Sequence, residues 1–211
     1  PAGCPEDRLG QKLTPGPSGV VEAYCAAPMP VAGVADVVAL AHGTAHACAL
    51  TRGGAVRCWG GMGYGELGNR DHGAHGSKTP IEVTFPAQQP RGPAAGAIAV
   101  AAQGDWSCAV LEDRSVRCWG AGTLGQLGPA IKERSATPVA IAGIADVQEL
   151  SLGAYHACVR TGVGVRCWGY NGNGALGDGT GEARGAPVTP TGLPEVIQLS
   201  ASGDSMGSHT C

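Results

Sequence analysis

The chain has 211 residues, of which 43% are hydrophobic and 15% charged, and its 36 glycines and 15 prolines stand beside a single phenylalanine. Such a glycine and proline content can signal disorder, but the apolar fraction indicates a core, and short strands joined by glycine-rich turns satisfy both observations. The net charge of −3 argues against a nucleic-acid binder, and no apolar stretch reaches the roughly 18 residues expected of a membrane span.

Residues 1–30 come first and resemble nothing that follows them. We expect this segment to be an N-terminal cap or linker. Its two cysteines, Cys4 and Cys25, are then expected to pair and close a small loop.

From residue 31 onward the sequence repeats itself, which is the first property to look for because it decides the architecture. Each copy has a cysteine two places after a histidine or tryptophan, and then a Cys-Trp-Gly sequence. The three complete copies are His46-Ala-Cys48 to Cys58-Trp59-Gly60, Trp106-Ser-Cys108 to Cys118-Trp119-Gly120, and His156-Ala-Cys158 to Cys167-Trp168-Gly169. A Leu-Gly pair follows eight residues after each tryptophan, as in Leu67-Gly68.

A fourth copy starts at residue 192 and reaches His209-Thr-Cys211. We therefore expect repeats over residues 31–211, and the chain to be a fragment of a longer protein. The repeats are expected at about 31–83, 93–141, 143–190 and, in part, 192–211. The proline-rich stretch 84–95 accounts for most of the extra length of the first repeat and is expected to form an irregular surface loop.

Each copy contains two short apolar runs around a turn, for example Ala47 to Leu50 and Val56 to Trp59 around residues 51–55, which predicts a β-hairpin. No segment shows a convincing amphipathic helical stripe. Four short strands in a unit of about 50 residues are typical of a propeller blade. We predict an all-β fold of tandem four-stranded blades, with about three complete repeats and a partial fourth that form an incomplete ring.

The recurring pattern Gly-x-x-His-x-Cys-Ala-Leu, Gly-x-Val-x-Cys-Trp-Gly and Gly-x-Leu-Gly resembles the regulator of chromosome condensation repeat over residues 31–211. The middle copy departs from it, with Trp106 in the histidine position and Gly104 one place closer to the cysteine. The resemblance implies a β-propeller of about seven blades. Members with cysteine at both hairpin positions look like an extracellular bacterial branch.

The two cysteines of the first and second hairpins are symmetric about the turn, so they would face each other on antiparallel strands within disulfide range. In the third hairpin the cysteine spacing and the turn are both one residue shorter, which supports pairing within each hairpin. The expected disulfides are Cys48–Cys58, Cys108–Cys118 and Cys158–Cys167. Cys211 is left over, and we expect its partner beyond the end of this chain.

A zinc site is the competing interpretation of the cysteines. Structural zinc ligands often come in pairs spaced by about two to four residues, whereas these cysteines are nine and ten apart. His46 and His156 could supply further ligands, but Trp106 replaces the histidine in the middle copy. We expect no metal and no cofactor.

Several recurring residues are interpreted as scaffold. The glycine motif at residues 63–68 has the dinucleotide fingerprint spacing but no helical pattern follows it, so it is an inter-strand loop. The recurring tryptophans are expected between blades, and the recurring histidines to satisfy buried backbone groups. These residues are Trp59, Trp119 and Trp168, and His46, His156 and His209.

Residues that differ between copies are the candidates for partner contact, because the repeats build the scaffold and variable loops face ligands. Tyrosine and tryptophan also dominate binding hot spots. The candidate binding residues are Met62, Tyr64, Trp106, Tyr155, Tyr170 and Asn171. Packing at a blade edge is the alternative role for each.

No nucleophile with a base and no carboxylate pair stands out, so we expect no enzymatic activity. The sequence favours an extracellular or periplasmic module that binds a protein or cell-surface ligand through its loop face. The alternative is an accessory propeller of a larger secreted enzyme or inhibitor. Guanine-nucleotide exchange, which the resemblance also suggests, is disfavoured by disulfides.

Overall fold

The computed structural model describes residues 30–70, 76–86, 96–203 and 208–210. Cys4, Cys25 and Cys211 lie outside the described residues, as does most of the expected N-terminal cap. The described part contains strands and no helix. The strands are β1 (Val37–His42), β2 (His46–Thr51), β3 (Val56–Gly60), β4 (Ser77–Glu82), β5 (Ala97–Gln103), β6 (Trp106–Leu111), β7 (Val116–Ala121), β8 (Arg134–Ala140), β9 (Val147–Leu152), β10 (His156–Thr161), β11 (Gly164–Gly169), β12 (Arg184–Val188), β13 (Ala201–Gly203) and β14 (Ser208–Thr210).

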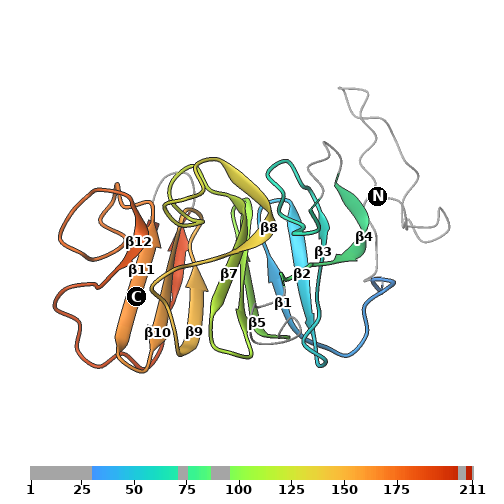
Figure 1. Cartoon of the computed structure of the whole chain (residues 1–211), viewed down its shortest axis with the longest axis horizontal. Helices are drawn as coiled ribbons and strands as arrows, with labels where there is room; N and C mark the ends of the chain where they lie inside the picture. The colour runs from blue at the N-terminus through green and yellow to red at the C-terminus, as the bar shows by residue number, and fades with distance from the viewer. Residues whose placement is uncertain (1–29, 71–75, 87–95, 204–207, 211) are drawn as a thin grey trace, which may run out of the picture.

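The strands form three four-stranded antiparallel sheets and one two-stranded sheet, each in sequence order. We call them blade 1 (β1–β4), blade 2 (β5–β8), blade 3 (β9–β12) and partial blade 4 (β13–β14). Figure 1 shows the three complete blades in a row, with blade 1 on the right and blade 3 on the left. The strands β1, β5 and β9 lie along one side of this row and contact one another in turn. The prediction of tandem four-stranded blades in an incomplete ring is confirmed.

The register of the central hairpins places the two cysteines of each blade opposite each other. The sulfur atoms are 2.11 Å apart in Cys48–Cys58, 2.09 Å in Cys108–Cys118 and 2.08 Å in Cys158–Cys167. The paired Cα atoms are 4.0 to 4.1 Å apart. This is close to the spacing of a non-hydrogen-bonded antiparallel pair, which brings side chains nearest together.

Cysteine and tryptophan are neighbours in β3, β7 and β11, so they point to opposite faces of the sheet. In blade 2, Cys118 packs toward blade 3 in one core cluster, while Trp119 packs toward blade 1 in another. The hydrophobic core is therefore divided into layers between blades. Each layer combines the disulfide face of one blade with the tryptophan face of the next.

The glycine after each tryptophan is required by the backbone. Gly120 has a φ of +100°, and a Cβ built there would lie 2.5 Å from the carbonyl oxygen of Asp105. Ala121 donates its N–H to that same carbonyl. A larger residue at Gly120 would break the contact between the third strand and the turn before β6.

The proline-rich stretch after β4 was expected to be an irregular surface loop, and part of it instead packs between blades. Within residues 84–95, Phe85 packs against the inter-blade layer, and its ring meets the Trp119 ring edge-on at 6.0 Å. Thr84 also donates its N–H to the carbonyl of Gly68. Residues 87–95 lie outside the described residues.

Candidate interaction surface

Two recurring tryptophans connect neighbouring blades, and we call each boundary between two blades a joint. The indole N–H of Trp119 donates to the carbonyl of Glu66 at 2.7 Å, across the boundary between blades 1 and 2. Trp168 repeats this contact with Gln126, at 2.8 Å, between blades 2 and 3. Both tryptophans are fully buried, whereas Trp59 in blade 1 is half-buried. The inter-blade role expected for the recurring tryptophans is confirmed for Trp119 and Trp168.

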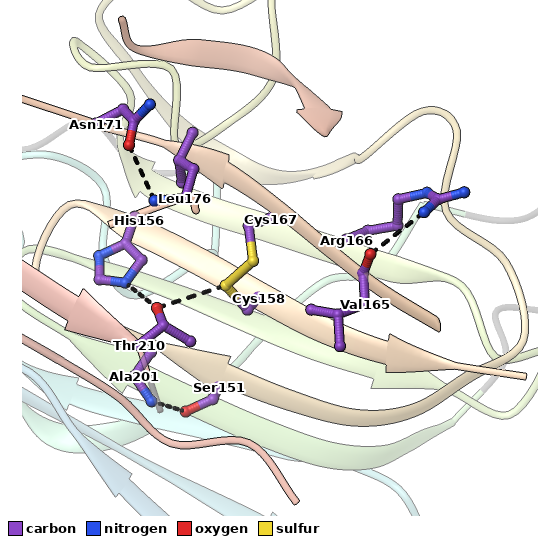
Figure 2. The surroundings of a disulfide bond; sticks show 10 residues. All are labelled: Ser151, His156, Cys158, Val165, Arg166, Cys167, Asn171, Leu176, Ala201 and Thr210. Carbon is purple, nitrogen blue, oxygen red and sulfur yellow. Dashed lines mark hydrogen bonds between the residues drawn. A yellow bond between two sulfur atoms is a disulfide. The ribbon is translucent and has the colours of Figure 1, made fainter. Parts of the chain in front are cut away.

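The recurring histidines form a second type of contact across the joints. The Nε2 atom of His46 is 2.7 Å from the hydroxyl oxygen of Ser107 in the next blade. Figure 2 shows the same contact one joint further on, where His156 Nε2 is 2.8 Å from the hydroxyl oxygen of Thr210. Both hydroxyls also lie beside the disulfide of the preceding blade. At Nε2, His46 and His156 therefore contact side-chain hydroxyls, where the sequence had predicted backbone groups.

The middle joint is built differently. Trp106 occupies the histidine position and donates its indole N–H to the carbonyls of Gly153 and Ala154, at 3.2 and 3.0 Å. The residue of blade 3 that corresponds to Ser107 is Ala157, which offers no hydroxyl. A histidine is thus followed one blade later by serine or threonine, and the tryptophan by alanine. The sequence itself shows this alternation, since Ser107, Ala157 and Thr210 directly precede a cysteine.

Two buried ionisable groups lie in the first joint. Desolvation by burial lowers the pKa of His46 to about 4, with a smaller contribution from the nearby His42. Burial also raises the pKa of the Glu66 carboxyl, although that carboxylate accepts the backbone N–H of Tyr64. Both groups are explained by their places in the joint and its loop, and neither forms a catalytic arrangement.

The candidate binding residues all come from one end of the blades, which we call the loop face. It consists of the loops after β3, β7 and β11, together with the turns before β2, β6 and β10. Figure 1 shows the long loops along one edge of the row and the hairpin turns along the other. The six candidate residues therefore lie at the same end of the blades.

Three of the six candidates are buried, which corrects the expectation that they face a partner. Met62 is 4% exposed and packs in the layer between blades 1 and 2, and Trp106 is fully buried in its joint. Asn171 is also fully buried. Variation between the copies therefore did not indicate exposure at these three positions.

Asn171 supports the loop after β11 from inside. Its Oδ1 accepts the N–H of Leu176 at 2.9 Å, as Figure 2 shows, and its Nδ2 donates to Asp178 and to the carbonyl of Thr180, both at 3.0 Å. Hydrogen bonds from Thr180, and then from Arg184 and Asn171, lower the pKa of Asp178 to about 2. The loop is therefore held by its own polar network.

The remaining three candidates are accessible. Tyr64 is 45% exposed on the loop after β3. Tyr155 and Tyr170 are half-buried and meet edge-on, with ring centroids 6.3 Å apart. We call these residues the loop-face tyrosines. Tyrosine presents a rigid apolar ring with a polar tip, which suits a protein contact.

Among the described residues, no group of three or more histidine, cysteine, aspartate or glutamate side chains is placed to hold a metal ion. No helix in the described part is long and apolar enough to cross a membrane. The sites that the fold defines are thus the inter-blade joints and the loop face of a disulfide-bearing β-propeller.

Comparisons with known proteins agree with this class. The model of the regulator of chromosome condensation (RCC1) repeat matches residues 34–66. The chain is 30% identical over 141 residues to the mitochondrial RCC1 domain-containing protein RUG3 of Arabidopsis thaliana, covering 62% of this chain and 30% of that protein. The repeats of this chain are therefore similar to the RCC1 repeat, and residues 34–66 match it directly.

Solved structures show the same fold. Prp20p from Saccharomyces cerevisiae matches with a TM-score of 0.70 and 18% identity, over 84% of this chain and 43% of that one. Yeast RCC1 (Prp20) bound to Kap60 matches with a TM-score of 0.67 and 19% identity, over 80% and 40%. The chain spans less than half of the length of each of these relatives.

Proposed function

We propose that this chain is a non-enzymatic propeller module that binds a protein or cell-surface ligand through its loop face, in an extracellular or periplasmic setting. The observation that carries the proposal is the edge-on pair of Tyr155 and Tyr170, accessible on loops that the blade scaffold holds in place. In this proposal residues 1–30 form a cap or linker, and the propeller repeats occupy residues 31–211.

The scaffold supports this role because its rigid elements lie behind the loops. Asn171 and Asp178 order the loop that follows Tyr170. Preorganised aromatic residues lose little conformational entropy on binding, which favours affinity. The three hairpin disulfides support an oxidising compartment, since such bonds are rare in reducing ones.

The relatives give the proposal a precedent. The structure of Prp20p was described with its binding properties to Gsp1p and histones, and a second structure holds it with Kap60. Propellers of this fold therefore bind proteins. The Arabidopsis relative is mitochondrial by name, so the extracellular or periplasmic setting rests on the disulfides alone.

The second candidate is an accessory propeller within a larger secreted enzyme or inhibitor. The observation in its favour is the set of three hairpin disulfides, which fit a secreted host protein equally well. The reading frame around this sequence distinguishes the two. A set of about seven repeats alone favours the binding module, and an appended hydrolase-like domain favours the accessory role.

Site-specific photo-crosslinking tests the loop face. A photoreactive phenylalanine analogue is placed at Tyr64, Tyr155 or Tyr170 in turn, in the protein secreted by its own cells. The matched control is Val163, which is 85% exposed at the hairpin turn on the opposite edge. We expect the loop-face positions to capture one common partner and Val163 to capture none. Crosslinks only from Val163, or none from the tyrosines, would contradict the proposal.

A further inference from the structure

Three exposed side chains lie where the loop after β3 in blade 1 meets β8 of blade 2. The guanidinium of Arg134, at the start of β8, donates to the carbonyl of Gly63 at 2.9 Å. Two residues further along β8, the carbonyl of Ala136 accepts the backbone N–H of Arg70 at 2.9 Å. Tyr64 lies between Gly63 and Arg70 in the loop and is 45% exposed. We call Tyr64, Arg70 and Arg134 the arginine–tyrosine cluster.

The backbone around this cluster is held by contacts between two complete blades. The N–H of Tyr64 donates to the Glu66 carboxylate at 2.8 Å. The next residue, Gly65, lies so close to β8 that a Cβ there would be 2.6 Å from the Cα of Ala136. The Tyr64 backbone is therefore fixed against blade 2, and the cluster does not involve partial blade 4.

Arg70 has a left-handed backbone conformation, with a φ of +68°. The corresponding residue of blade 3 is Gly179, which also lies eleven residues after the tryptophan of its blade and has a φ of +79°. The two loops follow the same course here, because Gly68 and Gly177 both have a φ of +64°. Glycine adopts this conformation without strain, whereas arginine adopts it at a cost. Blade 1 therefore holds a charged side chain where the backbone favours glycine.

Both guanidinium groups of the cluster have donors left for an anion. Arg114 also has a left-handed backbone, but its side chain donates to the Val147 carbonyl of the next blade at 3.3 Å. In the part of the chain that the structure describes, the Arg70 side chain forms no hydrogen bond or ion pair, and Arg134 forms no ion pair. A guanidinium has five N–H donors, and Arg134 contacts only Gly63 with them.

The cluster differs in charge from the protein as a whole. The chain has 14 lysines and arginines against 17 aspartates and glutamates, yet two arginines are exposed at this joint. Their exposed neighbours Lys132 and Glu133 carry opposite charges, and the buried Glu66 carboxylate accepts the Tyr64 N–H. A ligand that complements the cluster therefore carries negative charge beside an apolar group that packs on the Tyr64 ring.

We infer that the arginine–tyrosine cluster binds an acidic segment of the loop-face partner, with carboxylates on Arg70 and Arg134 and an apolar side chain on Tyr64. The planar guanidinium matches a carboxylate with two parallel hydrogen bonds. A sulfated glycan fits less well, because such polyanions are usually met by runs of about five to eight lysines and arginines. The inference rests on the proposed function, since it names the chemistry of the polypeptide that the loop face binds.

A synthetic peptide tests the inference on the 211-residue chain. The probe is Gly-Glu-Glu-Phe-Glu-Glu-Gly with a fluorescein label, and the matched control peptide has lysine in place of each glutamate. Fluorescence anisotropy at low ionic strength should show saturable binding of one acidic peptide per chain, at least about tenfold tighter than binding of the lysine peptide. Added salt should weaken this binding, because the charged groups are exposed.

Three variants of the chain locate the binding. Arg70→Gly removes a charge at a backbone conformation that suits glycine, and Arg134→Gln keeps a side-chain N–H for the Gly63 carbonyl. The control is Arg52→Gln, which removes the same charge from an exposed residue at the hairpin turn on the opposite edge. Each cluster variant should bind the acidic peptide about threefold to fivefold more weakly, and Arg52→Gln should bind it almost unchanged. Arg70→Gly should not lower Tm, which separates lost binding from lost folding.

Equal binding of the acidic and lysine peptides would overturn the inference, as would equal losses for Arg70→Gly and Arg52→Gln. A heparin oligosaccharide that binds the chain more tightly than the peptide, and loses this affinity with Arg70→Gly, would overturn it in favour of a sulfated glycan. If crosslinking at Tyr64 captures a partner but the acidic peptide does not bind, the acidic chemistry is wrong and the proposed function stands. Absence of crosslinks from all three loop-face tyrosines would instead remove the proposed function, and the inference with it.

Discussion

His46 in blade 1 and Ser107 in blade 2 share a buried hydrogen bond of 2.7 Å across the joint between two blades, 61 positions apart in sequence. The same relationship recurs between His156 and Thr210. Between these joints, Trp106 faces a blade with alanine in the hydroxyl position and bonds to backbone carbonyls instead. The two residues that meet across a joint are therefore complementary: a histidine meets a hydroxyl residue, and the tryptophan is followed by alanine. The same positions in neighbouring repeats, by contrast, hold different residues.

The first prediction concerns this match. Ser107→Ala removes the hydroxyl that partners His46 while the histidine stays buried, so we expect a loss of about 1–3 kcal/mol in the free energy of unfolding. Urea denaturation measures it. Ser115→Ala is the control, since its hydroxyl bonds to Asp113 at the surface, and should cost well under about 1 kcal/mol. Equal losses of unfolding free energy for the two variants would contradict a stabilising hydrogen bond between His46 and Ser107.

The second prediction is a pH dependence of stability. Burial lowers the pKa of His46 in the folded chain from 6.5 to about 4, so the unfolded chain takes up this proton first as pH falls. The contribution of neutral His46 to the free energy of unfolding is fully present above about pH 6.5. It is lost as pH falls toward 4, by up to about 3 kcal/mol. His46→Gln should therefore reduce the difference in unfolding free energy between pH 7.5 and 4.5. An unchanged difference would show that His46 is not the titrating group.

The third prediction is that each cysteine pairs within its own hairpin. Peptide mapping without reduction should recover Cys48 joined to Cys58, and the two other hairpin pairs likewise. Replacing both cysteines of one hairpin by serine should cost roughly 2–3 kcal/mol, mainly by freeing the unfolded chain. Free thiols at these positions, or bridges between blades, would contradict the structure.

The fourth prediction compares two tryptophans that occupy the same place in their repeats. Trp168→Phe loses the bond to the carbonyl of Gln126 and part of a fully buried ring, so we expect about 1–3 kcal/mol of destabilisation. Trp59→Phe should cost less, because Trp59 is half-buried at the outer face of blade 1. Thermal unfolding of the two variants in parallel gives the comparison, and a larger loss at Trp59 would go against it.

The sequence located the candidate surface, but it did not distinguish the exposed residues of that surface from the buried ones. Loop position put all six candidates at one end of the blades, since the repeat alignment defines where each strand stops. Tyr64 and Asn171 both lie in such loops, yet Tyr64 is 45% exposed and Asn171 is fully buried. Whether a loop residue turns outward depends on hydrogen bonds such as that from Leu176 to Asn171, which connect residues within the folded loop.

By itself the sequence determined the local architecture of this protein. The spacing of Cys48 and Cys58 around a turn, and its repetition, specify a hairpin and hence the blade, because strand register follows from the turn and from alternation. Only the tertiary structure decided how the blades meet, because it shows which side chain fills each joint. Those contacts join residues about 40 to 60 positions apart, and they depend on packing between sheets, which no local pattern encodes.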